Sequence, residues 1–154
     1  VLVYMAIYLA TTLAAFACVL LMRRDGKPVE EIGELAGLSR TNPWMAFALS
    51  MMMFSLAGIP PLAGFWAKFY VFLAAIDAKL YMLAVVGVVT SVIGAYYYLR
   101  LVKVIYFDEP KPAFEKGDIG VRAVLLISAL FVMALSLLPA PLLNSAGAAA
   151  KSLF

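Results

Sequence analysis

Histidine is absent from this 154-residue sequence, and cysteine occurs once, as Cys18. One cysteine cannot form an internal disulfide, and no cluster of Cys, His or carboxylate residues has the spacing of metal ligands. The sequence also contains neither a glycine-rich phosphate loop nor a nucleophile elbow. We therefore expect no metal, no cofactor and no catalytic redox centre on this chain.

Charged residues are also scarce, at 14% of the chain, whereas soluble domains contain about 25%. Hydrophobic residues make up 66%, and the mean hydropathy is +1.00. This composition predicts an all-α transmembrane protein in contact with the lipid bilayer. The net charge is +3, and the basic residues lie mostly between apolar segments, so they indicate membrane topology rather than a nucleic-acid partner.

Apolar segments divide the chain into four predicted spans within one membrane domain, residues 1–154. The spans cover about residues 1–22, 43–77, 80–105 and 120–139. The first segment lacks an initiator Met and a basic leader, so we interpret it as a span and not as a signal peptide. The simplest interpretation is that the chain is a fragment of a longer protein.

The second span is predicted to be discontinuous. As one straight helix it would reach about 50 Å, which is too long for a simple crossing of a ~30 Å hydrocarbon core. Gly58, Pro60, Pro61 and Gly64 interrupt it over residues 58–64, because prolines remove backbone donors and disfavour helical geometry before them. Two arrangements compete: one span with a broken middle, and two short spans joined by a hairpin.

The distribution of basic residues favours the broken span. In that arrangement the connections at 23–42 and 100–122 share the cytoplasmic side, and the 77–80 turn faces the periplasm. The shared side then holds nine basic residues against Lys79 and Lys151 on the other side: Arg23, Arg24, Lys27, Arg40, Arg100, Lys103, Lys111, Lys116 and Arg122. The hairpin arrangement removes this bias. Within the first connection, Pro28 and the apolar residues that follow it predict a short amphipathic helix.

Lys68 is the only charged residue between Pro43 and Ile76. A charge at mid-bilayer costs roughly 2.5–3.5 kcal/mol on insertion scales, so such a residue is by default a functional candidate. We expect Lys68 to be buried beside the aromatic residues Phe65, Trp66, Phe69 and Phe72. Burial disfavours the charged ammonium, so this lysine could gain and lose a proton. A static ion pair and a snorkelling side chain are the alternatives.

No carboxylate lies inside any predicted span, so the partners of Lys68 must be water, hydroxyl groups or residues outside this chain. Thr90 and Ser91 on the third span lie near the level of Lys68 when depth is counted from the 77–80 turn. On the first span, Tyr4, Tyr8, Thr11 and Thr12 are further candidates. Each of these hydroxyl groups could relay protons or serve only in packing.

Two segments resemble a known family. The stretch SLAGIPPLAGFWAKFYVF at 55–72 and the stretch LAGLSRTNP at 35–43 are similar to the broken-helix region of the antiporter-like membrane subunits of proton-pumping NADH–quinone oxidoreductase, respiratory complex I. The resemblance covers nearly the whole chain and corresponds to the C-terminal part of those subunits.

The resemblance implies a proton-translocating subunit of the bacterial inner membrane, with other membrane subunits as partners. It assigns Lys68 to the output half-channel on the periplasmic side. Flavin, iron–sulfur clusters, NADH and quinone would bind to other subunits. Two alternatives stay open: a subunit of a related cation/proton antiporter or membrane hydrogenase, and a structural membrane segment whose lysine is static.

Overall fold

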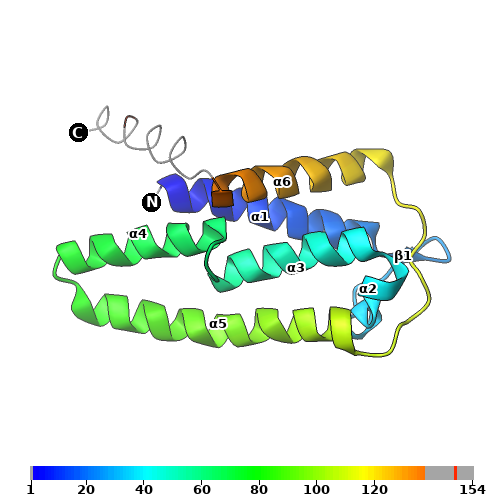
Figure 1. Ribbon diagram of the computed structural model, residues 1–154, viewed down its shortest axis with the longest axis horizontal. Helices are drawn as coiled ribbons and strands as arrows, with labels where there is room; N and C mark the ends of the chain where they lie inside the picture. Colours follow the sequence, from blue (N-terminus) through cyan, green and yellow to red (C-terminus); the bar gives the residue numbers. More distant parts are fainter. Residues whose placement is uncertain (1, 138–147, 149–154) are drawn as a thin grey trace.

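The computed structural model describes residues 2–137 and residue 148 (Figure 1). Helices dominate this part of the chain. Its only sheet is a β-hairpin whose two strands have two residues each. In chain order the elements are α1 (Leu2–Leu21), β1 (Arg23–Arg24), β2 (Lys27–Pro28), the 3-10 helix η1 (Ile32–Leu35), α2 (Leu38–Thr41), α3 (Pro43–Ala57), α4 (Ala63–Asp77), α5 (Tyr81–Phe107) and α6 (Ile119–Leu137).

Three of the described helices, α1, α5 and α6, are long and apolar enough to cross a membrane. The predicted second span corresponds to two helices of 15 residues each, α3 and α4. Figure 1 shows α4 continuing away from the end of α3, while the long helix α5 returns alongside both. Residues 138 and 139, the predicted end of the fourth span, lie outside the described residues.

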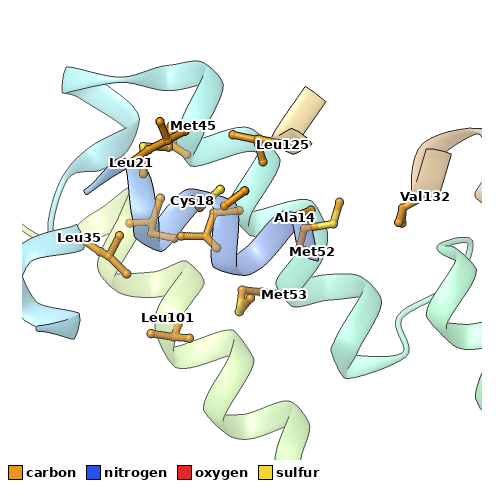
Figure 2. Packing of buried hydrophobic residues seen from close by; sticks show 14 of the residues in the cluster. Ala14, Cys18, Leu21, Leu35, Met45, Met52, Met53, Leu101, Leu125 and Val132 are labelled. Atoms are coloured by element: carbon orange, nitrogen blue, oxygen red, sulfur yellow. The ribbon is translucent and has the colours of Figure 1, made fainter. Parts of the chain in front are cut away.

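The bundle is held together by apolar packing between neighbouring helices. The most extensive helix contacts join α1 to α6 and α3 to α5. Ala14 and Cys18 of α1 and Met52 of α3 are fully buried in this core (Figure 2). Small residues allow close approach between helices, as at Gly87, where an added Cβ would collide with the ring of Phe72 on α4.

The predicted amphipathic helix after Pro28 is wrong. Pro28 ends the β-hairpin instead, and only η1 and the single turn α2 follow it. Gly37 explains the interruption, because it adopts a left-handed conformation with φ of 62° and its N–H donates to the carbonyl of Val104 on α5. The segment therefore binds to the end of α5 rather than lying free as a surface helix.

The two basic connections meet at one end of the bundle. The N–H of Glu115 donates to the carbonyl of Arg23, and the N–H of Lys111 donates to that of Ala36. Glu34 forms ion pairs with Arg24 and Lys111 at the same place. The turn between α4 and α5, which carries Lys79, lies at the opposite end (Figure 1).

Candidate functional site

The helix break begins with a glycine cap at the end of α3. Gly58 has φ of 83°, its N–H donates to the carbonyls of Phe54 and Ser55, and the N–H of Ile59 donates to Phe54. This is the Schellman arrangement, in which a left-handed glycine satisfies carbonyls that the helix leaves unpaired. An added Cβ at Gly58 would lie 3.0 Å from Cδ of Lys68, so the cap also leaves room for the lysine.

Two serine hydroxyls accept the free backbone donors at the start of α4. The N–H of Ala63 donates to Oγ of Ser136 on α6 at 2.9 Å, and the N–H of Gly64 donates to Oγ of Ser55 on α3 at 3.1 Å. Gly64 lies so close to Ser55 that an added Cβ would overlap the serine carbonyl. The non-helical residues are therefore 58–62, two fewer than predicted, because Ala63 and Gly64 already belong to α4.

Lys68 lies about one turn into α4 and reaches back to the end of α3. Its Nζ donates to the carbonyl of Ala57 at 3.3 Å. That carbonyl belongs to the last residue of α3 and has no acceptor role inside the helix, so it is a natural partner for an ammonium group. The break thus supplies both the space and the hydrogen-bond acceptor for the lysine.

The prediction that Lys68 is buried is wrong for this chain, since the side chain is only partly buried. It lines a cavity of about 230 Å³ whose walls include residues near the surface. Two of the lining residues show this: Tyr8 is 48% exposed, and Thr90 is exposed as well. In the described chain the lysine is therefore reachable from outside the helix bundle.

The cavity brings together most of the predicted hydroxyl groups. It is lined by Tyr4, Ile7, Tyr8, Thr11, Ser55, Leu56, Gly64, Ala67, Lys68, Thr90, Ser91, Gly94 and Tyr98. Thr12 is not among these residues. Thr11 and Thr90 donate to carbonyls of their own helices, at Ile7 and Val86, and each oxygen can still accept a hydrogen bond. The rings of Tyr4 and Tyr8 are stacked, with centroids 5.9 Å apart.

Three polar features of the site were not predicted: Ser55, Ser136 and Tyr98. The helical period gives a signal for Tyr98, which follows Thr90 and Gly94 at four-residue steps and so shares their face of α5. Ser55 and Ser136 stand in apolar helices, where a hydroxyl needs a partner. Only the fold shows that their partners are the first N–H groups of α4.

The predicted aromatic surroundings of Lys68 are also wrong. Phe65, Trp66 and Phe69 contact one another with ring centroids 5.4–6.3 Å apart, and none of them lines the cavity. The residues of α4 that do line the cavity, 64, 67 and 68, share one face of the helix. The cavity beside Lys68 is therefore lined by hydroxyl-bearing side chains, three of them tyrosines, and not by the phenylalanine and tryptophan rings of α4.

The charges near the site are few. Within residues 2–137, the ion pairs lie at the loop end of the bundle or at the end of α5, and none includes Lys68. The described residues contain no group of three or more His, Cys, Asp or Glu side chains that could hold a metal ion. Among the described residues, the polar groups that face Lys68 are hydroxyls and the carbonyl of Ala57.

The described residues form a bundle of apolar helices, three of them long enough to cross a membrane, and comparison with known proteins identifies the family. The chain belongs to the NADH:quinone oxidoreductase/Mrp antiporter transmembrane family, whose model matches residues 1–94. This confirms the family that residues 35–72 resemble.

Within this family the chain is similar to NADH-quinone oxidoreductase subunit N. It is 62% identical over 154 residues to the subunit of Methylobacterium nodulans and 64% identical to that of Azorhizobium caulinodans. Each match covers the whole of this chain but only 32% of the length of the relative. These similarities and the apolar helices fit a multi-pass protein of the bacterial inner membrane.

Two solved structures share the fold. A chain of respiratory complex I from Thermus thermophilus, solved with bound Aureothin, matches with a TM-score of 0.76 and 35% identity, over 89% of this chain and 31% of that chain. A chain of the Mrp complex from Dietzia sp. DQ12-45-1b matches with a TM-score of 0.71 and 25% identity, over 88% of this chain and 34% of that chain.

Proposed function

We propose that this chain is part of a proton-translocating membrane subunit of NADH–quinone oxidoreductase and that Lys68 is a proton-transfer group in its output half-channel. In this proposal α3 and α4 are the two halves of one discontinuous span. The observation that carries it is the position of Lys68, which contacts the open end of α3 and lines a hydroxyl-rich cavity. Discontinuous helices with exposed backbone groups are a recurrent ion site in transporters.

The cavity has the chemistry that proton transfer requires. Its volume of about 230 Å³ can hold several waters, each of which needs polar partners. Hydroxyl groups of Tyr8, Thr90 and Ser91 can both donate and accept hydrogen bonds, so they can join waters into a chain. A charged Lys68 donates to the carbonyl of Ala57, and a neutral Lys68 can accept a proton from such a chain.

The depth of the lysine agrees with a half-channel. Lys68 precedes Asp77 at the end of α4 by nine residues, which is about 13 Å of helical rise. A path of that length along α4 runs from Lys68 to the turn that carries Lys79, at the end of the bundle opposite the basic connections. By the positive-inside rule this end is periplasmic, so the cavity would release protons to the periplasm.

The partners follow from the same proposal. Other membrane subunits of the complex would cover part of the apolar surface, and lipid the rest. Flavin, iron–sulfur clusters, NADH and quinone would be held by other subunits. A second candidate is a subunit of a cation/proton antiporter, favoured by the match to the Mrp complex. The higher identity to the complex I chain and the subunit N relatives support the first candidate.

A substitution series at Lys68 tests the proposal in the full-length subunit within its assembled complex. Lys68→Ala should reduce coupled quinone reduction and proton pumping, while NADH oxidation by artificial electron acceptors stays largely intact. Lys68→Arg should not restore full pumping, because an arginine does not release its proton. Lys79→Ala, in the exposed turn, is the matched control and should pump normally.

The same series separates the alternatives. Normal assembly and wild-type pumping in Lys68→Ala would favour a structural segment. Full activity of Lys68→Arg would mean that the residue supplies only a fixed positive charge. Pumping that depends on sodium rather than on quinone reduction would favour the antiporter candidate.

A further inference from the structure

A second, larger cavity lies between α3 and α6, away from Lys68. It has a volume of about 630 Å³ and an apolar wall formed by such residues as Met51, Met52, Leu126 and Met133. Leu21, Met45 and Leu125 converge on it from α1, α3 and α6 (Figure 2). Apolar packing alone would not leave such a groove empty in an assembled protein, since unfilled space forfeits contacts.

The polar groups of this groove are confined to one end. Arg122, Glu115 and Asn42 line it where the helices meet the basic connections. Arg122 is exposed and forms no ion pair within residues 2–137. Trp44 is 77% exposed at the same level, which is typical of a residue at the membrane–water interface. The groove thus has a charged mouth at the membrane surface and an apolar body.

The length of the groove matches one leaflet of a membrane. Its wall extends from residue 44 to residue 52 on α3 and from residue 122 to residue 133 on α6. At 1.5 Å per residue these distances are about 12 and 16 Å, close to half of a ~30 Å hydrocarbon core. A membrane-spanning helix of another protein would need a groove through the whole core, whereas an acyl chain of one leaflet needs only this depth.

We propose that this groove binds a glycerophospholipid of the leaflet at the basic end of the bundle. One acyl chain lies between α3 and α6, and the phosphate is bound by the guanidinium of Arg122, a geometry that arginine suits well. Basic pockets between membrane helices recurrently bind lipid head groups. Glu115 and Asn42 at the mouth are suited to an ammonium head group, so phosphatidylethanolamine is the expected class.

Photocrosslinking tests the proposal in the full-length subunit, within the complex reconstituted into lipid vesicles. The probe is phosphatidylethanolamine with a diazirine at the end of one acyl chain. Mass spectrometry should find adducts on both walls, in peptides covering 44–52 and 125–133. These adducts should saturate at a low fraction of probe, whereas adducts on the exposed face of α5 should rise in proportion to the probe.

Two variants address the two parts of the site. Arg122→Gln should lower the groove adducts roughly tenfold, because it removes a charge-assisted bond to phosphate. Ala129→Phe should lower them by filling the apolar body, with the charges unchanged. The control Lys103→Gln removes an exposed cation near the same end of the bundle and should leave the adducts unchanged.

Three results would overturn the proposal. Groove adducts that never saturate in the wild type show collision with bulk lipid only, and this outcome does not depend on how the variants fold. Adducts that are equal in the wild type and both variants exclude a role for Arg122 and for the groove. Crosslinks from the groove to another polypeptide segment, without lipid adducts, show that protein fills it.

Discussion

Ser136 and Ser55 are the residues on which the geometry of the break depends most directly. Each hydroxyl accepts from a backbone N–H of the first turn of α4, and Ser136 itself donates to the carbonyl of Val132 at 2.8 Å. In a membrane interior a backbone donor without a partner is costly, so these side chains make the break tolerable. They also fix the start of α4, and with it the position of Lys68 one turn later.

Replacing Ser136 with alanine should loosen this first turn. The change leaves the N–H of Ala63 without a partner in a buried place, at a cost of about 1–3 kcal/mol. Hydrogen exchange of the peptide covering residues 59–66, measured in the assembled complex, should become roughly tenfold faster or more. Ser136→Thr, which keeps the hydroxyl, should restore slow exchange.

Ser128→Ala is the matched control for this prediction. Ser128 lies on the same helix, is buried to the same extent as Ser136 and makes no hydrogen bond to α4. Its substitution should leave exchange at 59–66 unchanged. An equal acceleration in Ser128→Ala would show that the effect comes from general loosening of α6 and not from the lost bond.

At the scale of elements, Glu34 links the two basic connections. It accepts a hydrogen bond from Arg24 on the β-hairpin, and Nζ of Lys111 lies 3.5 Å from its carboxylate. The guanidinium of Arg24 also donates to the carbonyl of Pro112 and lies over the ring of Phe114. Hydrogen bonding from Arg24, followed by the charge of Lys111, lowers the pKa of Glu34 below its usual 4.5, although desolvation opposes this.

The contacts of Glu34 with Arg24 and Lys111 form a clamp between the two connections, and the lowered pKa of Glu34 gives this clamp a defined pH dependence. Because the folded-state pKa is lowered, the ionised carboxylate stabilises the clamp above its usual pKa of 4.5, and this contribution is lost as the pH falls through the lower folded-state value. Protection of the amides of Lys111 and Glu115 against hydrogen exchange should therefore be constant near neutral pH and fall only below 4.5.

Glu34→Gln should lower the same protection at neutral pH and remove its dependence on acid. Asp108→Asn provides the control, since Asp108 pairs with an exposed Lys103 at 3.7 Å and such surface pairs contribute little. The interpretation of Glu34 as the pH-sensitive group fails if Glu34→Gln keeps wild-type protection at neutral pH and loses it in acid.

At the scale of the whole molecule, the arrangement of the helices gathers the connections at 23–42 and 100–122, which carry nine of the twelve basic residues, at one end of the bundle, the basic end. Figure 1 shows the ends of α1 and α5 and the starts of α3 and α6 gathered at the basic end, while the turn between α4 and α5 lies at the other. Both cavities follow from this layout. The Lys68 cavity lies between α1, α3, α4 and α5, and the apolar groove opens toward the basic connections.

This arrangement predicts a definite topology in the membrane. Cysteine introduced at Lys116 should react with a membrane-impermeant maleimide only from the cytoplasmic side, and cysteine at Lys79 only from the periplasmic side. Cys18 is buried and should remain unlabelled. Labelling of residue 79 only from the cytoplasmic side would favour the arrangement in which 43–77 forms two spans joined by a hairpin.

The sequence by itself determined the class of the molecule, because composition and span length are local properties that the bilayer constrains strongly. It also identified Lys68 and the glycine–proline interruption, since a lone charge and a proline pair in apolar sequence have few explanations. Depth counted from the 77–80 turn selected Thr90 and Ser91, and the first span offered Tyr4, Tyr8, Thr11 and Thr12; all of these except Thr12 line the cavity with Lys68.

Only the tertiary structure decided which face of each helix these residues occupy and what satisfies the break. Thr12 does not line the cavity although it neighbours Thr11, because adjacent residues on a helix differ by about 100°. Ser136 lies 73 positions from Ala63, and Gly37 meets α5 through Val104. Contacts at such separations depend on how the helices pack, and no local pattern in the sequence encodes them.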